Sequence, residues 1–351
     1  MVGESVAGAE KENVLTQTAE RILLKAGDCA VTLLPQFGGK IASICVKGHE
    51  LLQAPLAPVA PRTPTMAFDA GDASGWDECL PSVAACAVET AAGPVQIPDH
   101  GDLWRVEWKI REQGTATPTS ASRSLGTPAG NRDQESRTIT LQGDCFSLPL
   151  ALKRTFRLAE WAEGWSLQLD YLLTNVGQVS APWSWAAHPL FAVDVGDTIE
   201  LPASIATLQI EGSGGKRLGA TGETVGWPVA KGARDSEGRE TKLNVVQGLS
   251  SRVADKLFAG PLAAGENWCA LRRRKEGLRI RVGFDSAATP YLGLWLCYGG
   301  WPERKGPKQM CVAMEPATAP VDSLAQTGEW SRVLGPGERC AWQMRVAIEI
   351  V

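Results

Sequence analysis

The sequence lacks the patterns that mark metal sites, nucleic-acid surfaces and membrane spans. Its nine cysteines form no C-x-x-C pair, which excludes a zinc ribbon or a thioredoxin-type site. No apolar run approaches the roughly 20 residues that a membrane-spanning helix needs. Lysine and arginine number 35 against 39 aspartates and glutamates, a balance that disfavours a nucleic-acid or anionic-membrane surface. We therefore expect no metal, no cofactor, no nucleic acid and no membrane partner, and a neutral or weakly charged small molecule as ligand.

Signals for export are also missing. Residues 1–25 contain no basic start followed by an apolar run, so no signal peptide is visible, and no N-x-S/T sequon occurs. The cysteines are odd in number and scattered, and several lie in apolar runs, as buried thiols of a reducing compartment do. The sequence therefore predicts a cytoplasmic protein, and it gives no indication of the oligomeric state.

Short alternating segments dominate the chain. Residues 152–158 and 165–175 alternate apolar with polar side chains around Glu163-Gly164, a pattern that predicts a β-hairpin. Helical periodicity is almost absent. Many short strands punctuated by glycine and proline are typical of an all-β protein, and we expect a large antiparallel β-sandwich. Further strands are predicted near residues 29–35, 41–46, 137–142, 278–284, 291–298, 310–314 and 340–351.

The strand pattern continues through most of the length without an obvious linker. Residues 1–20 are polar and are expected to be disordered, and residues 21–351 are expected to form a single sandwich domain. Two polar stretches, 111–136 and 211–242, interrupt the pattern, and both are predicted to be long surface loops because strand patterns resume after each.

Tryptophan is unusually common among the aromatic residues, with 13 Trp against 3 Tyr and 7 Phe. A flat indole ring suits stacking on the C–H face of a pyranose, although most tryptophans fill cores. Trp76, Trp104, Trp185 and Trp295 lie nearest in sequence to the polar segments described next, and we take Trp76 and Trp295 as candidate sugar-binding residues.

Three segments carry candidate chemistry. The chain has only three histidines. His188 follows a tryptophan-rich apolar stretch, and His100 lies in a polar segment before Trp104. Glu315 ends an apolar run, and Pro316 is expected to stop the strand there. A carboxylate backed by apolar residues is well placed for a raised pKa.

These segments resemble the galactose mutarotase (aldose 1-epimerase) family. The family has a catalytic histidine in an H-P-x-F-like segment, matched by His188–Phe191. A catalytic glutamate in an E-P segment near the C-terminus is matched by Glu315–Pro316, with Pro320–Asp322 shortly after it. A substrate-binding histidine followed by glycine is matched by His100–Gly101. The three occur in the family's order, and the likeness spans roughly residues 20–350.

The resemblance implies a galactose mutarotase-like supersandwich and an isomerase that interconverts the α and β anomers of a free sugar. Ring opening needs one group to protonate the ring oxygen and another to take the proton of the anomeric hydroxyl. On the family's pattern His188 is the acid, Glu315 is the base, and His100 binds the sugar. Histidine and a tuned glutamate suit these tasks at neutral pH. A core histidine and a structural ion pair are the alternatives for His188 and Glu315.

The sequence also departs from the best-known members. Their early Asn-Arg substrate-binding segment is missing, and Gly71–Pro81 stands in its place. Within it, Asp77 and Glu78 are adjacent, so on a strand they would point to opposite faces. We expect Asp77 to bind a sugar hydroxyl. This departure indicates a divergent branch of the family.

Three other functions remain open at this stage. A hexose-phosphate 1-epimerase of the same superfamily would need a cationic cluster for the phosphate, for which Arg62, Arg105, Arg304 and Lys308 are candidates. A non-catalytic carbohydrate-binding protein could use the same scaffold. A glycoside hydrolase or lyase would need a second catalytic carboxylate at about 5–10 Å.

Overall fold

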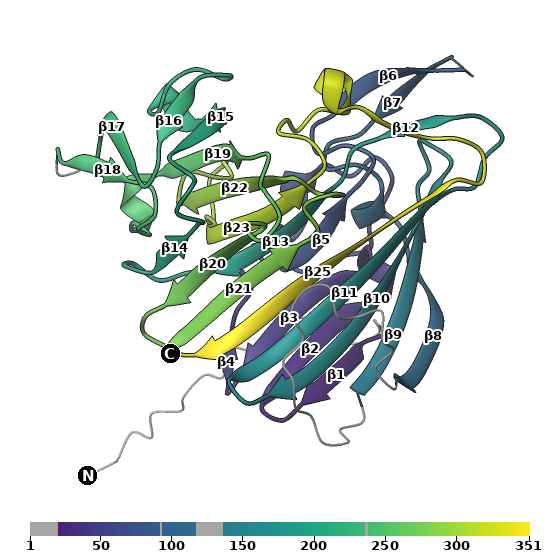
Figure 1. The fold of residues 1–351 in the computed structure, drawn as a ribbon, viewed down its shortest axis with the longest axis horizontal. Coiled ribbons are helices and arrows are strands. Elements are labelled where there is room, and N and C mark those ends of the chain that lie inside the picture. The colour runs from purple at the N-terminus through teal and green to yellow at the C-terminus, as the bar shows by residue number, and fades with distance from the viewer. Residues whose placement is uncertain (1–19, 92, 117–135, 236–237) are drawn as a thin grey trace, which may run out of the picture.

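Two large antiparallel sheets make up most of the molecule (Figure 1). The structure is a computed structural model that describes residues 20–91, 93–116, 136–235 and 238–351. Within them, the first sheet has 11 strands in the order β1-β2-β3-β5-β13-β23-β22-β19-β15-β16, with β4 paired to β3. The second has eight strands in the order β14-β20-β21-β25-β11-β10-β9-β8. Three two-stranded ribbons, β6-β7, β12-β24 and β17-β18, complete the described strands.

The strand bounds follow by sheet. The first sheet contains β1 (Ile22–Ala26), β2 (Cys29–Leu34), β3 (Lys40–Val46), β4 (His49–Glu50), β5 (Trp76–Cys79), β13 (Ala186–Ala192), β15 (Thr207–Ser213), β16 (Thr224–Gly226), β19 (Val253–Ala259), β22 (Tyr291–Tyr298) and β23 (Met310–Ala317). The second contains β8 (Lys109–Ala116), β9 (Ser136–Asp144), β10 (Leu150–Trp161), β11 (Gly164–Asn175), β14 (Thr198–Glu200), β20 (Trp268–Arg273), β21 (Leu278–Phe284) and β25 (Arg339–Ile350). The ribbons are β6 (Cys86–Thr90), β7 (Gly93–Ile97), β12 (Ala181–Trp183), β17 (Val229–Arg234), β18 (Glu240–Lys242) and β24 (Arg332–Leu334).

The core lies between the two sheets. In β11, Leu167, Leu169 and Leu173 are buried and alternate with partly exposed residues, because successive side chains of a strand point to opposite faces. Inward side chains from both sheets, such as Val31 of β2 and Met344 of β25, belong to one apolar cluster. The predicted all-β antiparallel sandwich is therefore confirmed.

Two central strands of the first sheet, β13 and β23, do not alternate. Six of the seven residues of β13 and seven of the eight residues of β23 are buried. Side chains on one face, such as Ala187 and Met314, join the core between the sheets. Those on the other face, such as Leu190 and Ala313, form a separate small cluster with partly buried tryptophans. The outer face of the sheet is therefore covered at this place, and it is here that the candidate site lies.

Several predicted elements are borne out, and some are not. The predicted hairpin is β10-β11, whose pairing runs to Trp161 opposite Gly164. The predicted loop at 111–136 is wrong for its first residues, because β8 continues to Ala116, and residues 117–135 lie outside the described residues. The predicted loop at 211–242 contains β16, β17 and β18. These strands were missed because they lie at a sheet edge or outside the sandwich, where few residues are buried and no apolar alternation is required.

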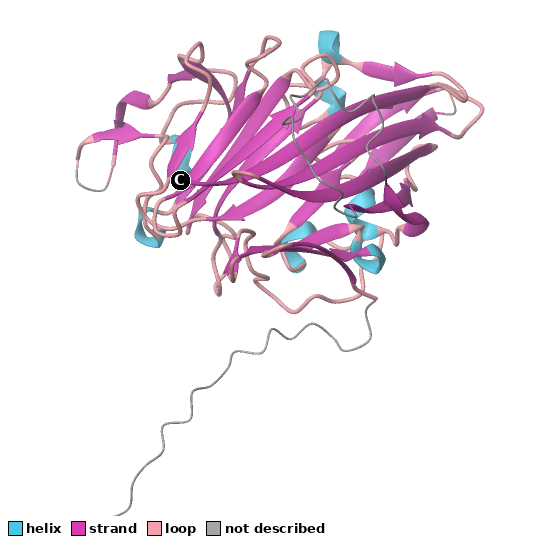
Figure 2. Ribbon diagram, turned by 60° about the horizontal axis from the view of Figure 1, so that its bottom comes forward, coloured by secondary structure: helices cyan, strands magenta, loops and turns pink. Residues whose placement is uncertain are grey.

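The described helices are short 3-10 turns, seen as small coils among the strands in Figure 2. Among the described residues no helix has the length and apolar character to cross a membrane. The predicted disorder of residues 1–20 lies outside the described residues except for Glu20.

Candidate active site

A row of paired residues crosses five strands of the first sheet and passes through the site. Asp77 of β5 pairs in register with His188 of β13, and Glu315 of β23 pairs with Gly293 of β22, which in turn pairs with Phe258 of β19. Residues opposite each other on neighbouring antiparallel strands project from the same face. The row therefore places its side chains together on the outer face of the 11-stranded sheet.

His188 and Glu315 face each other where the ladder between β13 and β23 is interrupted. The register pairs Ala186 with Ala317 and Leu190 with Ala313, which sets His188 opposite Glu315. Prolines follow both residues in sequence and cannot donate a ladder hydrogen bond. The strand β23 nevertheless continues to Ala317. Glu315 thus lies within its strand, and the expectation that Pro316 ends the strand is wrong. The strand persists because its other neighbour, β22, continues the pairing through Leu292 opposite Pro316.

The two side chains converge closely. His188 Nε2 lies 3.9 Å from Glu315 Oε1. The His188 side chain is 8% exposed and that of Glu315 is fully buried. Neither Glu315 Oε1 nor His188 Nδ1 has a hydrogen-bond partner in the structure. A buried carboxylate oxygen without a donor is costly, and a ligand hydroxyl would satisfy it.

Burial shifts the two groups in opposite directions. It raises the pKa of Glu315, against the effect of the Lys256 ammonium, which lowers it. It lowers the pKa of His188 well below the ordinary value, assisted by electrostatic interactions with His100 and with the Lys256 ammonium. Burial therefore disfavours the charged form of both side chains.

His100 is held over this pair by its backbone and by an aromatic neighbour. Its φ of 58° and the φ of 67° at Gly101 put both residues in the left-handed region. Its ring stacks on Phe68 with centroids 3.7 Å apart, and its Nδ1 lies 2.9 Å from a carboxylate oxygen of Asp99. The His100 and His188 rings meet edge to face at 5.1 Å. His100 is thus brought close to His188 and Glu315, the other two histidine and glutamate candidates from the sequence.

The three residues line a cleft of about 380 Å³, within the size range of small-molecule sites. Trp295, a candidate sugar-binding residue, is also in its lining, and its Nε1 donates to Gln309 Oε1 at 3.0 Å. The cleft thus combines aromatic side chains with carboxylates and histidines. The whole lining consists of Ala67, Phe68, Asp69, Val83, Ala84, Asp99, His100, His188, Lys256, Trp295, Trp301, Gln309, Glu315 and Asp322.

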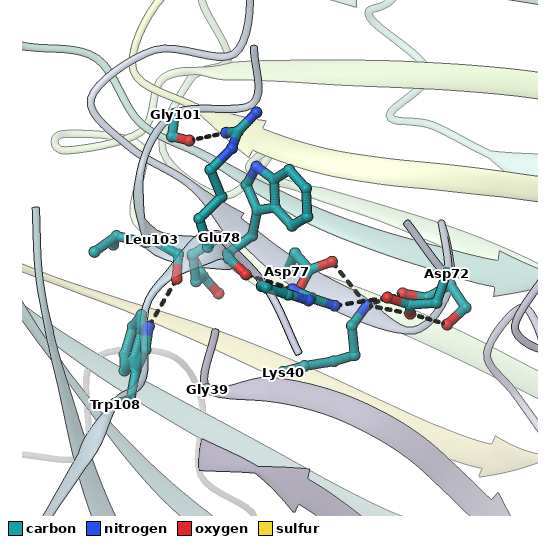
Figure 3. A network of polar contacts seen from close by, with 12 residues as sticks. Gly39, Lys40, Asp72, Asp77, Glu78, Gly101, Leu103 and Trp108 are labelled. Atoms are coloured by element: carbon teal, nitrogen blue, oxygen red, sulfur yellow. Dashed lines mark hydrogen bonds and ion pairs between the residues drawn. The ribbon is translucent and has the colours of Figure 1, made fainter. Parts of the chain in front are cut away.

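Trp76 and Asp77, the other two predicted substrate-binding residues, are placed elsewhere. Trp76 is fully buried in the core between the sheets, so its ring is not available for stacking on a sugar. Asp77 is on the same face as His188, but it is 3% exposed and is bound by Lys40 at 2.7 Å and Arg62 at 3.2 Å. Figure 3 shows Lys40 reaching between Asp77 and Asp72. Asp77 is therefore paired with two cations and is not among the residues that line the cleft.

The four proposed phosphate ligands do not form a cationic cluster in the cleft. Arg62 is bound by Asp72 and Asp77, and Arg105 donates to the carbonyls of Met66, Asp99 and Gly101. Arg304 donates to the Asp69 carbonyl, and Lys308 donates to the carbonyls of Pro302 and Arg304. None of the four is in the lining of the cleft.

Sequence reasoning missed Lys256, Phe68 and Gln309. Lys256 donates to Glu315 Oε2 and lies 3.5 Å from Asp322 Oδ1. Its strand, β19, was not among those predicted, and the charged pair Asp255-Lys256 within a short apolar run was the signal that could have found it. Within the described part of the chain, no cluster of three or more histidine, cysteine or acidic side chains could hold a metal ion.

Comparison with solved structures bears on the fold. The Slr1438 protein of Synechocystis shares 17% identity over 100% of both chains, with a TM-score of 0.66. A galactose mutarotase-like protein of Lactobacillus casei shares 14% identity, with a TM-score of 0.60, over 94% of this chain and 100% of that one. A candidate aldose 1-epimerase of Escherichia coli shares 15% identity, with a TM-score of 0.62, over 95% of this chain and 99% of that one.

The chain therefore has the fold of these galactose mutarotase-like proteins, at low sequence identity. No family model matches the sequence. No curated protein matches it either.

Proposed function

We propose that the protein is an aldose 1-epimerase that interconverts the anomers of a free, unphosphorylated sugar. The observation that carries the proposal is the approach of His188 Nε2 to Glu315 Oε1 at 3.9 Å on the wall of a cleft. Both side chains are buried, and each has an atom without a protein partner. An acid and a base at this separation can serve the ring oxygen and the anomeric hydroxyl, which are bonded to the same carbon.

The reaction runs through an open chain. Glu315 Oε1 takes the proton of the anomeric hydroxyl, and the electrons left on that oxygen form the C1 carbonyl. The bond between C1 and the ring oxygen breaks, and His188 delivers a proton to that oxygen. Rotation about C1–C2 presents the other carbonyl face, and the two protons return as the ring closes. The pair needs one proton between them and no cofactor.

The charges of the lining favour an unphosphorylated substrate. Asp69, Asp99, Glu315 and Asp322 contribute carboxylates to the cleft, against the single ammonium of Lys256, which two of them already bind. A phosphate would meet net repulsion here, whereas sugar hydroxyls can donate to carboxylates. Anomer exchange of a hexose phosphate is therefore the second candidate function, after anomer exchange of a free sugar.

All nine cysteines are free, and a cytoplasmic location is part of the proposal.

Polarimetry tests the proposal directly. Freshly dissolved α-D-glucose and α-D-galactose should relax to their equilibrium rotation faster with the protein than without it. Glu315→Gln keeps the volume of the side chain and removes the base, and it should lower the catalysed rate about 10²- to 10⁴-fold. Glucose 6-phosphate should be turned over less efficiently than the free sugars.

A matched control uses a carboxylate outside the cleft. Glu200, on β14, binds Arg272 and Arg279, and Glu200→Gln should leave the rate unchanged. The proposal is wrong if no aldose relaxes faster with the wild-type protein. Sugar-dependent tryptophan fluorescence without any acceleration would instead indicate a non-catalytic carbohydrate-binding protein.

A further inference from the structure

Lys256 reaches Glu315 across an intervening strand. Lys256 lies on β19 and Glu315 on β23, and β22 separates them in the sheet. Its ammonium nevertheless donates to Glu315 Oε2. The lysine side chain is 10% exposed, and its Nζ lies over the ring of Phe258 at 5.3 Å. Burying an unpaired ammonium is costly, and the ion pair with Glu315 compensates for the burial of Lys256.

Gly293 makes this contact possible. It is the residue of β22 directly opposite Glu315 on one side and Phe258 on the other. A Cβ at this position would lie 3.1 Å from Glu315 Oε2 and 3.2 Å from the Phe258 ring. Both distances are tighter than ordinary van der Waals contacts. The missing side chain leaves the gap through which the carboxylate and the ammonium meet.

We propose that Lys256 is a positioning residue that keeps Glu315 ionised as the base and leaves its Oε1 as the oxygen that faces the substrate. The inference rests on the proposed function. Lys256 occupies Oε2, so the unpartnered Oε1 is the oxygen turned to His188 and the cleft. Burial opposes the charge of Lys256, but the Asp322 and Glu315 carboxylates outweigh it and raise its pKa, so it remains an ammonium at neutral pH.

The charged groups around Glu315 determine the direction in which its pKa shifts. An ammonium lowers the pKa of a neighbouring carboxyl and of a neighbouring imidazole alike, and Lys256 does both here. Asp322 acts against it on Glu315. The ionisable groups that face Glu315 from the surrounding segments are Lys256 of β19, His188 of β13, Cys79 of β5, Cys311 of β23, His100 and Asp322.

The pH dependence of kcat/KM for mutarotation reports this role. The active pair holds one proton, so the rate falls at low pH, where the pair gains a second proton, and at high pH, where it loses the first. Lys256→Met should move both limbs to higher pH, by about 1 to 3 units. At neutral pH the variant should be slower, and raising the pH should restore much of the rate. Lys256→Arg retains the charge and should keep the limbs near their wild-type positions.

Two further variants separate this role from a merely structural one. Gly293→Ala keeps every charged group but crowds the contact, and it should shift the limbs in the same direction by less. Arg217→Met removes the ion pair with Asp255, the residue before Lys256 on β19, and it should leave both limbs in place. An equal loss of rate at every pH in Lys256→Met, with unshifted limbs, would overturn the proposal.

A measurement without substrate keeps this inference apart from the proposed function. Thermal melts of wild type, Lys256→Met, Glu315→Gln and the double variant form a cycle. If the two groups are coupled, the double variant should lose less Tm than the sum of the single losses, because neither charge is left unpaired. Additive losses would refute the coupling whether or not any sugar is turned over. Coupling in a protein that turns over no aldose would refute the proposed function and with it the catalytic role of Lys256.

Discussion

At the scale of single residues, Gly101 shows how the backbone sets the site. It follows His100 in the left-handed region, with a φ of 67°, and it bridges to Leu80 beside β5. A Cβ at Gly101 would collide with the Leu80 backbone. The glycine thus allows the turn that carries His100 into the cleft, and a side chain here would disturb the ligand site as well as the fold.

Gly101→Ala should therefore lower the free energy of unfolding by about 1–3 kcal/mol through strain alone, with a further loss from the collision, and it should raise KM. Chemical denaturation and mutarotation kinetics measure the two effects. Gly48→Ala is the matched control, because Gly48 also has a positive φ, of 82°, but open space around it. Equal losses in the two variants would show that the contact with Leu80 does not matter.

The sequence could identify the chemically distinctive residues but not their surroundings. His188, Glu315 and His100 were singled out from rare residue types and short motifs, and Trp295 from its place in the chain; the structure brings all four to one cleft. Trp76 was singled out by its place in the chain, and its side chain faces the opposite side of the sheet. Sequence position alone does not reveal the face, because a shift of one residue along a strand reverses it.

Asp77 and Glu315 illustrate the other limit. Both are acidic residues on strands of the first sheet, yet Asp77 is neutralised by Lys40 and Arg62, whereas Glu315 keeps one oxygen without a partner. The partners of Asp77 precede it by 37 and 15 residues. Long-range pairings of this kind decide whether a carboxylate is structural or reactive, and they depend on the folded topology.

At the scale of elements, Glu78 ties the first sheet to the second. It lies on β5 and is fully buried, and it accepts hydrogen bonds from Arg154 of β10 and from Tyr171 of β11, the latter at 3.1 Å. Trp185 donates to its other oxygen at 2.7 Å. Glu78 directly follows Asp77 and is turned to the opposite face, into the core, as expected for adjacent residues on a strand. It forms a polar contact between the sheets.

Arg154 and Tyr171, the two donors that reach Glu78 from the second sheet, should contribute differently to the free energy of unfolding. Arg154→Met leaves the Glu78 carboxylate buried without its counter-charge and should cost about 3–5 kcal/mol of unfolding free energy. Tyr171→Phe removes one of several donors and should cost about 1–3 kcal/mol. Urea denaturation of the two variants measures both values. The opposite ranking would mean that the ion pair is less important than the hydroxyl.

Element prediction succeeded where burial imposed alternation and failed where it did not. The β10-β11 hairpin was predicted from its alternating residues because it lies over the core. The first described residues of the stretch 111–136 are exposed and belong to β8, at the edge of the eight-stranded sheet. An edge strand of this kind is held by backbone pairing with one neighbour, and that pairing leaves no mark on the hydrophobic pattern.

At the scale of the whole molecule, stability should depend on pH through buried carboxylates such as Asp72. Its side chain is 4% exposed and is bound by Lys40 at 3.1 Å and Arg62 at 2.7 Å. Burial opposes its ionisation, but the two cations outweigh burial and lower the pKa of Asp72 well below its ordinary value. The stabilisation is therefore complete above about pH 4, near the pKa of an unfolded aspartate, and it is lost as the pH falls toward the folded-state pKa.

Asp72→Asn should remove about 3 kcal/mol of unfolding free energy at neutral pH. It should also flatten the fall of stability between about pH 5 and pH 2 relative to wild type, because the variant has no such proton to bind. Thermal melts across this range measure the difference. Parallel curves for the two proteins would show that folding does not lower the pKa of Asp72.

The position of β25 has a consequence for biosynthesis. This strand comes after every other described strand in the chain, yet it lies inside the eight-stranded sheet, between β21 and β11 (Figure 1). Until residues 339–350 have left the ribosome, the two neighbours expose unpaired edges, which invite association with other chains. The growing chain therefore has to be shielded by a chaperone, or has to fold quickly, until its last described strand closes the sheet.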